Sequence, residues 1–412
     1  MKSKIIERED LGNEREALDL AAPAVQTGTD DRALKSAKSG KSGKSLSRIV
    51  VELAVLLPLT IFGLECLLSA AGVGQQEILQ PDPELGCVHI PGKKVTWRLE
   101  GFSRDAFSSA GLRDGEHLLN KPKGCYRIAL LGDSATEGLQ VDMAQTFSRQ
   151  LDGALAKTFS KKGVSYFEAM NFGCSSYSTG QELLQFKKQV AQYKPDLTIV
   201  LLCYGDTLEN TLDLSNRAHA EPKPYFYIDA QGKLAQDSSV LLASADKLVP
   251  NPLVDFLRSK SCLYGVWTQL NFNWNLTDKL YFRSMRFFQE VGRRMQGKAR
   301  AIEAPVYAQQ DKLKVTQALV TAFNDTAKEN GGKFALMLFP DVAAREAGWQ
   351  YDMRQLKAQG AAEHFDVIDL NPPFRSHWNP SSLFLQYHFS KEGHALVADT
   401  LTQYVKSTLA DR

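Results

Sequence analysis

The segment RIALLGDSATEG, residues 127–138, joins an apolar run to a Gly-Asp-Ser turn and then to the start of a helix. The run at 126–131 predicts a buried strand, so Ser134 lies just beyond its carboxyl end, where open α/β sheets bind their ligands. The N-terminus of a helix also offers free backbone N–H groups and a positive dipole end, which suit an oxyanion. An Asp-Ser pair at a helix start is also an ordinary cap. The position after a first strand favours Ser134 as a nucleophile, with Asp133 as a supporting residue.

Apolar, β-rich segments alternate with amphipathic helical segments from Tyr126 onward. The predicted strands are 126–131, 164–172, 197–204, 333–339 and 365–370, and the predicted helices include 179–193, 311–330 and 391–409. Such alternation predicts a parallel sheet with helices on both faces. The interval 211–310 interrupts this alternation with a pattern at 224–235 that predicts a hairpin, followed by a stretch rich in arginine and aromatic residues. We interpret this interval as an insertion that covers one end of the sheet.

The apolar stretch IVVELAVLLPLTIFGLECLLSAAGVG occupies residues 49–74, which is long enough to cross a bilayer. A basic run precedes it and acidic residues follow it, so the N-terminus is expected in the cytoplasm. The sequence therefore divides into a disordered cytoplasmic tail (1–47), a transmembrane anchor (48–74), a lead-in segment (75–125) and the main domain (126–412). A buried core helix is the alternative, favoured by Glu52 and Glu65 within the run. Carboxylates inside a membrane usually face a partner, so an envelope protein bound through the anchor is a further hypothesis.

The overall charge and the cysteines exclude several kinds of partner. The formal net charge is +2, which gives no global field, and nucleic acid is not expected as a partner. Six cysteines are present, at positions 66, 87, 125, 174, 203 and 262. Their spacing matches no zinc site and selects no disulfide. We therefore expect neither a metal nor an organic cofactor.

Four segments resemble the sequence blocks of the SGNH (GDSL-type) hydrolase family. They are GDS at 132–134, MNFGCSSYSTG at 170–180, CYGDTLEN at 203–210 and FLQYHFSKEGHALVA at 384–398. The resemblance covers most of residues 80–412. It implies a flavodoxin-like, three-layer α/β/α domain with a parallel sheet and Ser134 as the nucleophile. The lead-in sequences at 81–92 and 108–116 are similar to those of membrane-anchored bacterial members, which are associated with adding or removing acetyl groups on polysaccharides.

The resemblance also implies an oxyanion hole. Its donors would be the backbone N–H groups of Ser134 and Gly173. The third block of the family carries an asparagine as a side-chain donor, but Gly205 occupies that position here, whereas Asp206 matches as a supporting residue. Loss of one such donor lowers the rate by about two to three orders of magnitude in other enzymes. Asn210 is a candidate substitute.

The last block implies that His388 is the catalytic base. Leu385 stands where the family has the aspartate that orients the histidine. Gln386 could orient the ring instead if its carbonyl reached Nδ1, and Asp369 is a less favoured candidate. His394, further along the last helix, fits a packing or capping role.

The function favoured by these residues is serine-dependent ester chemistry on a glycan O-acyl group, as an esterase (deacylase) or an O-acyltransferase. The substrate would be acetylated polysaccharide at the cell surface or for export, and the main domain would be periplasmic or on the cell surface. The altered blocks leave a second hypothesis open. The protein could be a weak or inactive SGNH-fold protein that binds glycan or scaffolds an envelope complex. A lipid esterase or thioesterase is the third.

The membrane orientation gives a first prediction. A reporter fused after Arg412 should behave as extracytoplasmic, because the basic flank precedes the apolar stretch. Paired alkaline phosphatase and green fluorescent protein fusions measure this orientation. A fusion active only in the cytoplasm would contradict both the anchor and the polysaccharide hypothesis.

Overall fold

The computed structural model describes residues 46–74, 77–98, 100–158, 164–212, 220–245, 256–257, 260–274, 311–341 and 348–410. The chain divides into two compact units, Met1–Thr60 and Ile61–Arg412. The larger unit holds the sheet and every residue of the candidate site.

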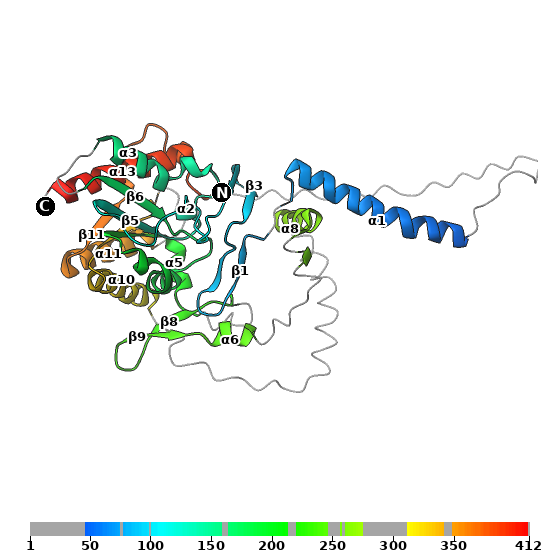
Figure 1. The fold of residues 1–412 in the computed structure, drawn as a ribbon. Helices are drawn as coiled ribbons and strands as arrows, with labels where there is room; N and C mark the ends of the chain where they lie inside the picture. The colour runs from blue at the N-terminus through cyan, green and yellow to red at the C-terminus, as the bar shows by residue number, and fades with distance from the viewer. Residues whose placement is uncertain are drawn as a thin grey trace, which may run out of the picture. The chain divides into compact units, whose positions relative to one another are not determined.

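Five parallel strands form the central sheet (Figure 1). They are β5 (Cys125–Leu131), β6 (Tyr166–Asn171), β7 (Leu197–Leu202), β10 (Lys333–Leu338) and β11 (Asp366–Asp369). Their spatial order is β11-β10-β7-β5-β6. If the five strands are numbered 1 to 5 along the chain and read from the β6 edge, the order is 2-1-3-4-5, which is the flavodoxin-like order. The order reverses between β5 and β7, so the carboxyl ends of these two strands define the expected ligand site.

Helices cover both faces of the sheet, and Figure 1 shows the three layers. One face carries α3 (Phe147–Thr158) and α13 (Lys391–Ala410), which pack against each other. On the other face α10 (Lys312–Glu329) packs against β10 and against α4 (Thr179–Gln185). The remaining helical elements of the domain are α2 (Ser134–Glu137), η1 (Met143–Gln145), η2 (Phe186–Val190), η3 (Ala191–Tyr193), α5 (Tyr204–Glu209), α11 (Trp349–Glu363), α12 (Asn371–Ser376) and η6 (Pro380–Leu383).

The predicted three-layer fold is confirmed, with small differences at the element ends. The predicted strand 197–204 ends at Leu202, because the two residues that follow already belong to the cap and first turn of α5. The predicted helix 179–193 is a composite in which the π-helical turn η2 and the 3₁₀ turn η3 follow α4. Helix α11 was not predicted, because its sequence has little amphipathic periodicity.

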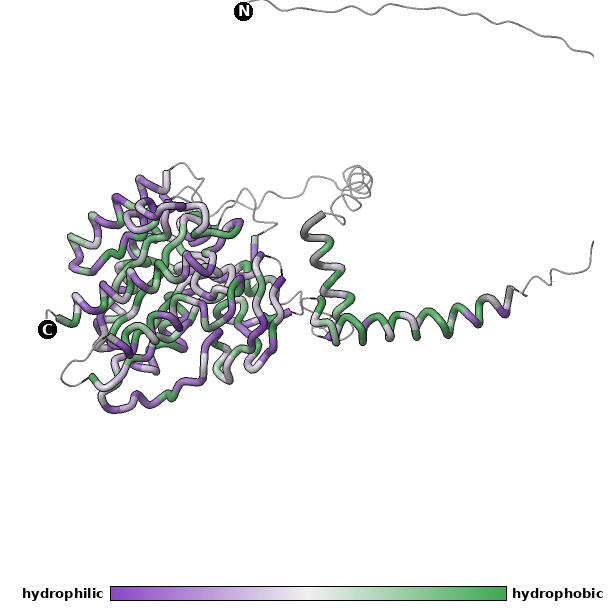
Figure 2. Tube along the Cα trace, turned by 90° about the horizontal axis from the view of Figure 1, so that it is seen from above, coloured by the Kyte–Doolittle hydropathy of each residue, from purple (hydrophilic) through white to green (hydrophobic). Residues whose placement is uncertain are grey.

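The apolar stretch near the N-terminus forms helix α1 (Leu46–Ala71), drawn as a long hydrophobic run in Figure 2. Its segment Val50–Ala71 is long and apolar enough to cross a membrane. Glu65 has a partner within the chain. Its carboxylate accepts hydrogen bonds from Ser261 Oγ at 3.0 Å and from the backbone N–H of Leu263 at 3.1 Å, and also from the N–H of Cys262. This carboxylate therefore caps α8 (Cys262–Trp274).

Two antiparallel hairpins form the lead-in between α1 and the sheet. The first pairs β1 (Leu79–Asp82) with β2 (Gly86–His89), and the second pairs β3 (Lys94–Trp97) with β4 (Ser103–Ala106). The interval 211–310 contains the expected hairpin as β8 (Tyr225–Ile228) and β9 (Leu234–Asp237), followed by α6 (Ser239–Ala245) and α8. The arginine-rich stretch expected near 283–294 lies outside the described residues.

A buried arginine joins the lead-in to the sheet. Arg127 on β5 is fully buried, and its Nε donates to Glu168 Oε2 at 2.6 Å, its register partner on β6. Its Nη1 donates to the carbonyls of Leu119 at 3.0 Å and Tyr193 at 2.8 Å, and its Nη2 donates to that of Leu118. A buried charge is tolerated only when it is paired and hydrogen-bonded in this way.

Arg127→Met should lower the free energy of unfolding by about 3–5 kcal/mol, because Glu168 and three carbonyls lose a buried cationic donor. Urea denaturation followed by circular dichroism measures the change. The matched control is Lys314→Met, which removes an exposed pair with Asp311 and should change stability by less than about 1 kcal/mol. Equal effects of the two substitutions would contradict the anchoring role of Arg127.

Candidate active site

The turn between β5 and α2 presents Ser134 at the expected edge of the sheet. Gly132 adopts a φ of 153°, and a Cβ there would lie 2.1 Å from Thr136 Oγ1, so only glycine fits this turn. Asp133 caps α2 by accepting a hydrogen bond from the N–H of Ala135 at 2.9 Å. Ser134 is the first residue of the helix. The Gly-Asp-Ser sequence therefore builds the turn and leaves the serine hydroxyl free to act.

Ser134, His388 and Glu100 form a continuous chain of hydrogen bonds. The distance from Ser134 Oγ to His388 Nε2 is 2.8 Å, and that from His388 Nδ1 to Glu100 Oε2 is 2.6 Å. A carboxylate accepts the Nδ1–H and so fixes the tautomer in which Nε2 can take the serine proton. This is the geometry of a Ser-His-acid triad.

His388 is presented by a short hairpin-like turn between η6 and α13. Phe384 and Phe389 form an antiparallel bridge, and the N–H of Leu385 donates to the carbonyl of His388 at 2.8 Å. These backbone hydrogen bonds therefore hold the turn that carries the imidazole. Its side chain is 21% exposed, so a substrate can reach the ring.

Glu100 comes from the lead-in segment, which lies against the residues that follow the nucleophile helix. The N–H of Phe102 donates to the carbonyl of Gln140 at 3.1 Å, and Ser103 Oγ donates to that of Leu139 at 2.6 Å. Gly101 permits this approach, since a Cβ there would lie 2.1 Å from the carbonyl oxygen of Gln140. The close backbone contact places the Glu100 carboxylate beside the His388 turn.

Arg113 connects the lead-in segment to the end of α2 through hydrogen bonds. Its side chain is fully buried, and its Nη1 donates to the carbonyls of Glu137 at 3.0 Å and Gly138 at 2.6 Å. Its Nη2 donates to the carbonyl of Val141 and to Asp105 Oδ2, both at 2.6 Å. These carbonyls belong to the end of α2 and the residues after it, so one guanidinium connects the lead-in to the nucleophile helix.

The Glu100 carboxylate is held in its charged form. Partial burial by itself raises the pKa of this carboxyl, but hydrogen bonds from the N–H groups of Tyr387 at 2.6 Å and His388 at 3.1 Å, and from the ring, outweigh it. The pKa of Glu100 therefore lies below its usual value. An ionised carboxylate at this point stabilises the imidazolium that forms when the serine is deprotonated.

The prediction that Gln386 orients the histidine is wrong, because His388 Nδ1 is bonded to Glu100. Leu385, at the family's aspartate position, instead contacts the lead-in next to Glu100, with its Cδ1 3.1 Å from the Cβ position of Gly101. The less favoured candidate Asp369 pairs with Lys357. No local sequence signal marks Glu100, since it lies 288 residues before the histidine.

The prediction that Gly173 donates to the oxyanion is also wrong. Its N–H donates to the Oδ1 of Asn171 at 2.9 Å. A Cβ at Gly173 would lie 2.2 Å from the backbone nitrogen of Glu137, so this glycine allows α2 to pack against the loop after β6. The residue is required for packing of the nucleophile helix.

Asn210 does not replace the missing side-chain donor. It is fully buried, its Oδ1 accepts the N–H of Gly180 at 3.0 Å, and its Nδ2 donates to Thr316 Oγ1 at 3.0 Å. Asp206, which was predicted as a supporting residue, caps α5 by accepting the N–H of Cys203 at 2.7 Å. Gly205 has open space around its Cβ position, with Glu209 Oε1 at 3.8 Å as the nearest atom.

Three carboxyl groups lie close together at the nucleophile turn, those of Asp133, of Glu182 on α4 and of Asp206 on α5. Burial raises the pKa of all three, and repulsion from Asp133 adds to the rise at Glu182 and Asp206. Cys203 Sγ lies 3.7 Å from Asp133 Oδ1.

His394 has the packing role expected of it. It is fully buried between Phe147 and Phe389, and its Nδ1 accepts the N–H of Phe147 at 3.3 Å. Burial lowers its pKa to about 3, so the ring is neutral. Within the described residues, no group of three His, Cys, Asp or Glu side chains could hold a metal ion.

Comparison with solved structures finds proteins of similar fold at low sequence identity. One is the lipase/acylhydrolase from Enterococcus faecalis, with 14% identity, a TM-score of 0.36, and coverage of 69% of this chain and 96% of that one. Another is the acetylxylan esterase Axe2 from Geobacillus stearothermophilus, with 11% identity, a TM-score of 0.36, and coverage of 68% and 93%. A third is TesA, with 12% identity, a TM-score of 0.35, and coverage of 68% and 98%. No protein-family model matches the chain, and no curated protein does.

Glu100→Gln should lower kcat for a small acetyl ester by about two to four orders of magnitude and leave KM nearly unchanged, because the amide no longer holds the reactive tautomer. Steady-state kinetics with 4-nitrophenyl acetate measure this effect. Glu116→Gln is the matched control, since that carboxylate is exposed and bonds only Ser109 in the lead-in. If Glu100→Gln keeps full kcat while Leu385→Asp raises it, the acid is assigned to the wrong residue.

Proposed function

We propose that this protein carries out serine-dependent acyl transfer on an ester, as an O-deacylase or an O-acyltransferase that acts on polysaccharide at the cell surface or on its way out of the cell. The observation that carries the proposal is the unbroken chain from Ser134 through His388 to Glu100. A protein that only binds glycan has no need of a charged carboxylate to orient this imidazole.

The chemistry follows from the three positions. Ser134 Oγ attacks the ester carbonyl while His388 Nε2 removes its proton, and Glu100 stabilises the imidazolium. The imidazolium then protonates the departing sugar oxygen, which leaves an acyl group on Ser134. Water or a hydroxyl of an acceptor, activated by the neutral His388, attacks the acyl group and regenerates the serine.

The backbone N–H of Ser134, at the N-terminus of α2, is assigned to the developing oxyanion. The loop after β6 lies beside the nucleophile turn, because the N–H of Cys174 donates to the carbonyl of Gly132 at 3.0 Å.

The polysaccharide and the extracytoplasmic location are supported by the sequence. Helix α1 has a segment that is long and apolar enough to cross a membrane, and the basic flank precedes it. The lead-in that supplies Glu100 is the same segment that resembles membrane-anchored members of the family. An acetyl ester is the expected group, as in the proteins that this lead-in resembles.

The scaffold hypothesis remains the second candidate, since Gly205 supplies no side-chain donor and Asn210 is held elsewhere. A complete triad weighs against it. The missing donor affects the rate of an enzyme by about two to three orders of magnitude and does not abolish the reaction.

Ser134→Ala should abolish labelling by a fluorophosphonate probe and lower kcat for 4-nitrophenyl acetate by at least about three orders of magnitude. The free energy of unfolding should change by no more than about 1 kcal/mol, because a serine at the start of a helix contributes at most about that much to stability. Acetate release from O-acetylated polysaccharide, with and without an unacetylated acceptor glycan, separates hydrolysis from transfer.

The control is Ser407→Ala, an exposed serine on α13 that should leave labelling and turnover unchanged. Folded wild-type protein that takes up no probe and releases no acetate would reject the enzyme and favour the scaffold. Labelling that persists in Ser134→Ala would place the nucleophile elsewhere.

A further inference from the structure

Two cysteines that are far apart in the sequence lie together at the junction of the lead-in and the sheet domain. Cys87 is on β2, and Cys174 follows β6. Their side chains are close enough for each thiol to affect the pKa of the other. Both belong to one apolar cluster, in which Cys174, Leu85 and Tyr177 are buried and Cys87 packs against them.

The backbones on both sides of this contact are held by buried hydrogen bonds. Tyr177 Oη donates to the carbonyl of Cys87 at 2.6 Å, and Gln181 Nε2 donates to that of Leu85 at 2.7 Å. On the other side the N–H of Cys174 donates to the carbonyl of Gly132 at 3.0 Å. The two thiols therefore meet as part of the folded structure, and a bond between them requires no change in chain topology.

The two thiols differ in access and acidity in a way that suits stepwise oxidation. Cys87 is partly exposed, and the side chain of Cys174 lowers the pKa of its thiol. Cys174 is buried, and burial raises the pKa of its thiol. The thiolate is the form that attacks a disulfide. Cys87 would therefore react first with an external oxidant, and Cys174 would complete the bond.

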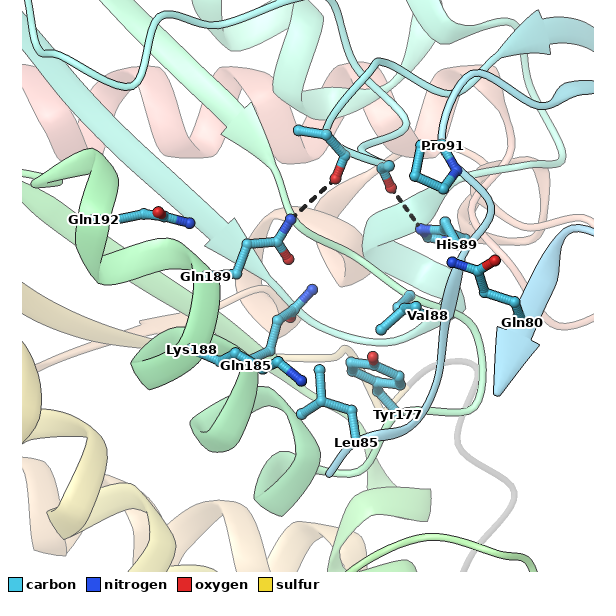
Figure 3. Close-up of a pocket in the computed structure, with 13 residues that line it drawn as sticks. Gln80, Leu85, Val88, His89, Pro91, Tyr177, Gln185, Lys188, Gln189 and Gln192 are labelled. Atoms are coloured by element: carbon cyan, nitrogen blue, oxygen red, sulfur yellow. Dashed lines mark hydrogen bonds between the residues drawn. The ribbon is translucent and has the colours of Figure 1, made fainter. Parts of the chain in front are cut away.

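A cavity of about 260 Å³ opens beside this pair (Figure 3). Its wall includes Cys174 itself, and Figure 3 shows Leu85, Val88, Tyr177 and Gln185 around it. None of the triad residues lines it. The cavity gives small reagents a route toward the otherwise buried side of the cysteine pair.

We propose that Cys87 and Cys174 form a disulfide in the native protein. This proposal rests on the proposed extracytoplasmic location. The oxidant is a thiol oxidoreductase that carries a disulfide. The Cys87 thiolate attacks one sulfur of that disulfide and releases one of its thiols. Cys174 then attacks the mixed disulfide at the sulfur of Cys87 and releases the second. Overall two protein thiols lose two electrons and two protons, and the oxidant gains them as two thiols.

The bond would secure the segment that supplies the triad acid. Cys87 and Glu100 belong to the same lead-in, and Cys174 belongs to the loop beside the nucleophile turn. A covalent link between them restrains the unfolded chain across a long loop, which stabilises the folded state. The lead-in would then stay docked even if single hydrogen bonds break.

The test uses the full-length protein in detergent, treated with excess oxidised glutathione and digested under non-reducing conditions. Mass spectrometry should find a peptide that joins Cys87 to Cys174, and reduction should lower Tm by about 5 °C or more. Cys125→Ser is the control that should keep both the joined peptide and the Tm difference, whereas Cys87→Ser and Cys174→Ser should each lose them. Folded protein that keeps both thiols free under these conditions overturns the proposal.

The native state is tested by quenching cells in acid, alkylating the denatured protein without reduction and then mapping the two cysteines. Protection of both residues supports the proposal, and alkylation of both overturns it. The Ser134→Ala variant should form the same bond, so the result does not depend on whether the protein has esterase activity. The experiments therefore distinguish failure of the disulfide proposal from failure of the proposed acyl transfer.

Discussion

The structure of the site depends on one buried cation, the guanidinium of Arg113. It donates hydrogen bonds to carbonyls at the end of α2 and to Asp105 in the lead-in, so it joins the nucleophile helix to the segment that brings Glu100. A buried guanidinium is destabilising unless most of its donors are paired, and removal of its partners leaves a charge in an apolar interior. The four-residue helix α2 is too short to be stable by itself and relies on these contacts.

The consequence is that the candidate triad includes a residue from outside the α/β sheet domain. The sheet supplies Ser134 and the last helix supports the loop that carries His388, but the orienting carboxylate comes from outside both. Leu385 occupies the position where the family has an aspartate, and its side chain covers the backbone next to Glu100. The exchange keeps one carboxylate beside the imidazole and moves its place in the chain. The altered last block is thus compatible with an active triad.

The fold was predictable from the sequence because its signals are local. Strands β5, β7 and β10 are mainly apolar runs, and the Gly-Asp-Ser turn is recognisable from residues 127–138 alone. Glu100 was missed because its role arises from tertiary packing at Gly101 and Phe102, which leaves no periodic pattern. Gly173 and Asn210 were assigned wrongly for a related reason. Their residue types fit an oxyanion hole, but both residues make buried structural hydrogen bonds, those of Asn210 to residues distant in the sequence.

The separation of Glu100 from His388 by 288 residues also has a consequence for biosynthesis. During synthesis the glutamate is made first, the serine follows, and the histidine is added long after both. Contacts between such distant residues form late in folding, after the intervening sheet has closed the loop. Ser134 therefore stays without its base while the chain is still being made. An unfinished chain would therefore carry the serine without the imidazole that contacts it in the folded protein.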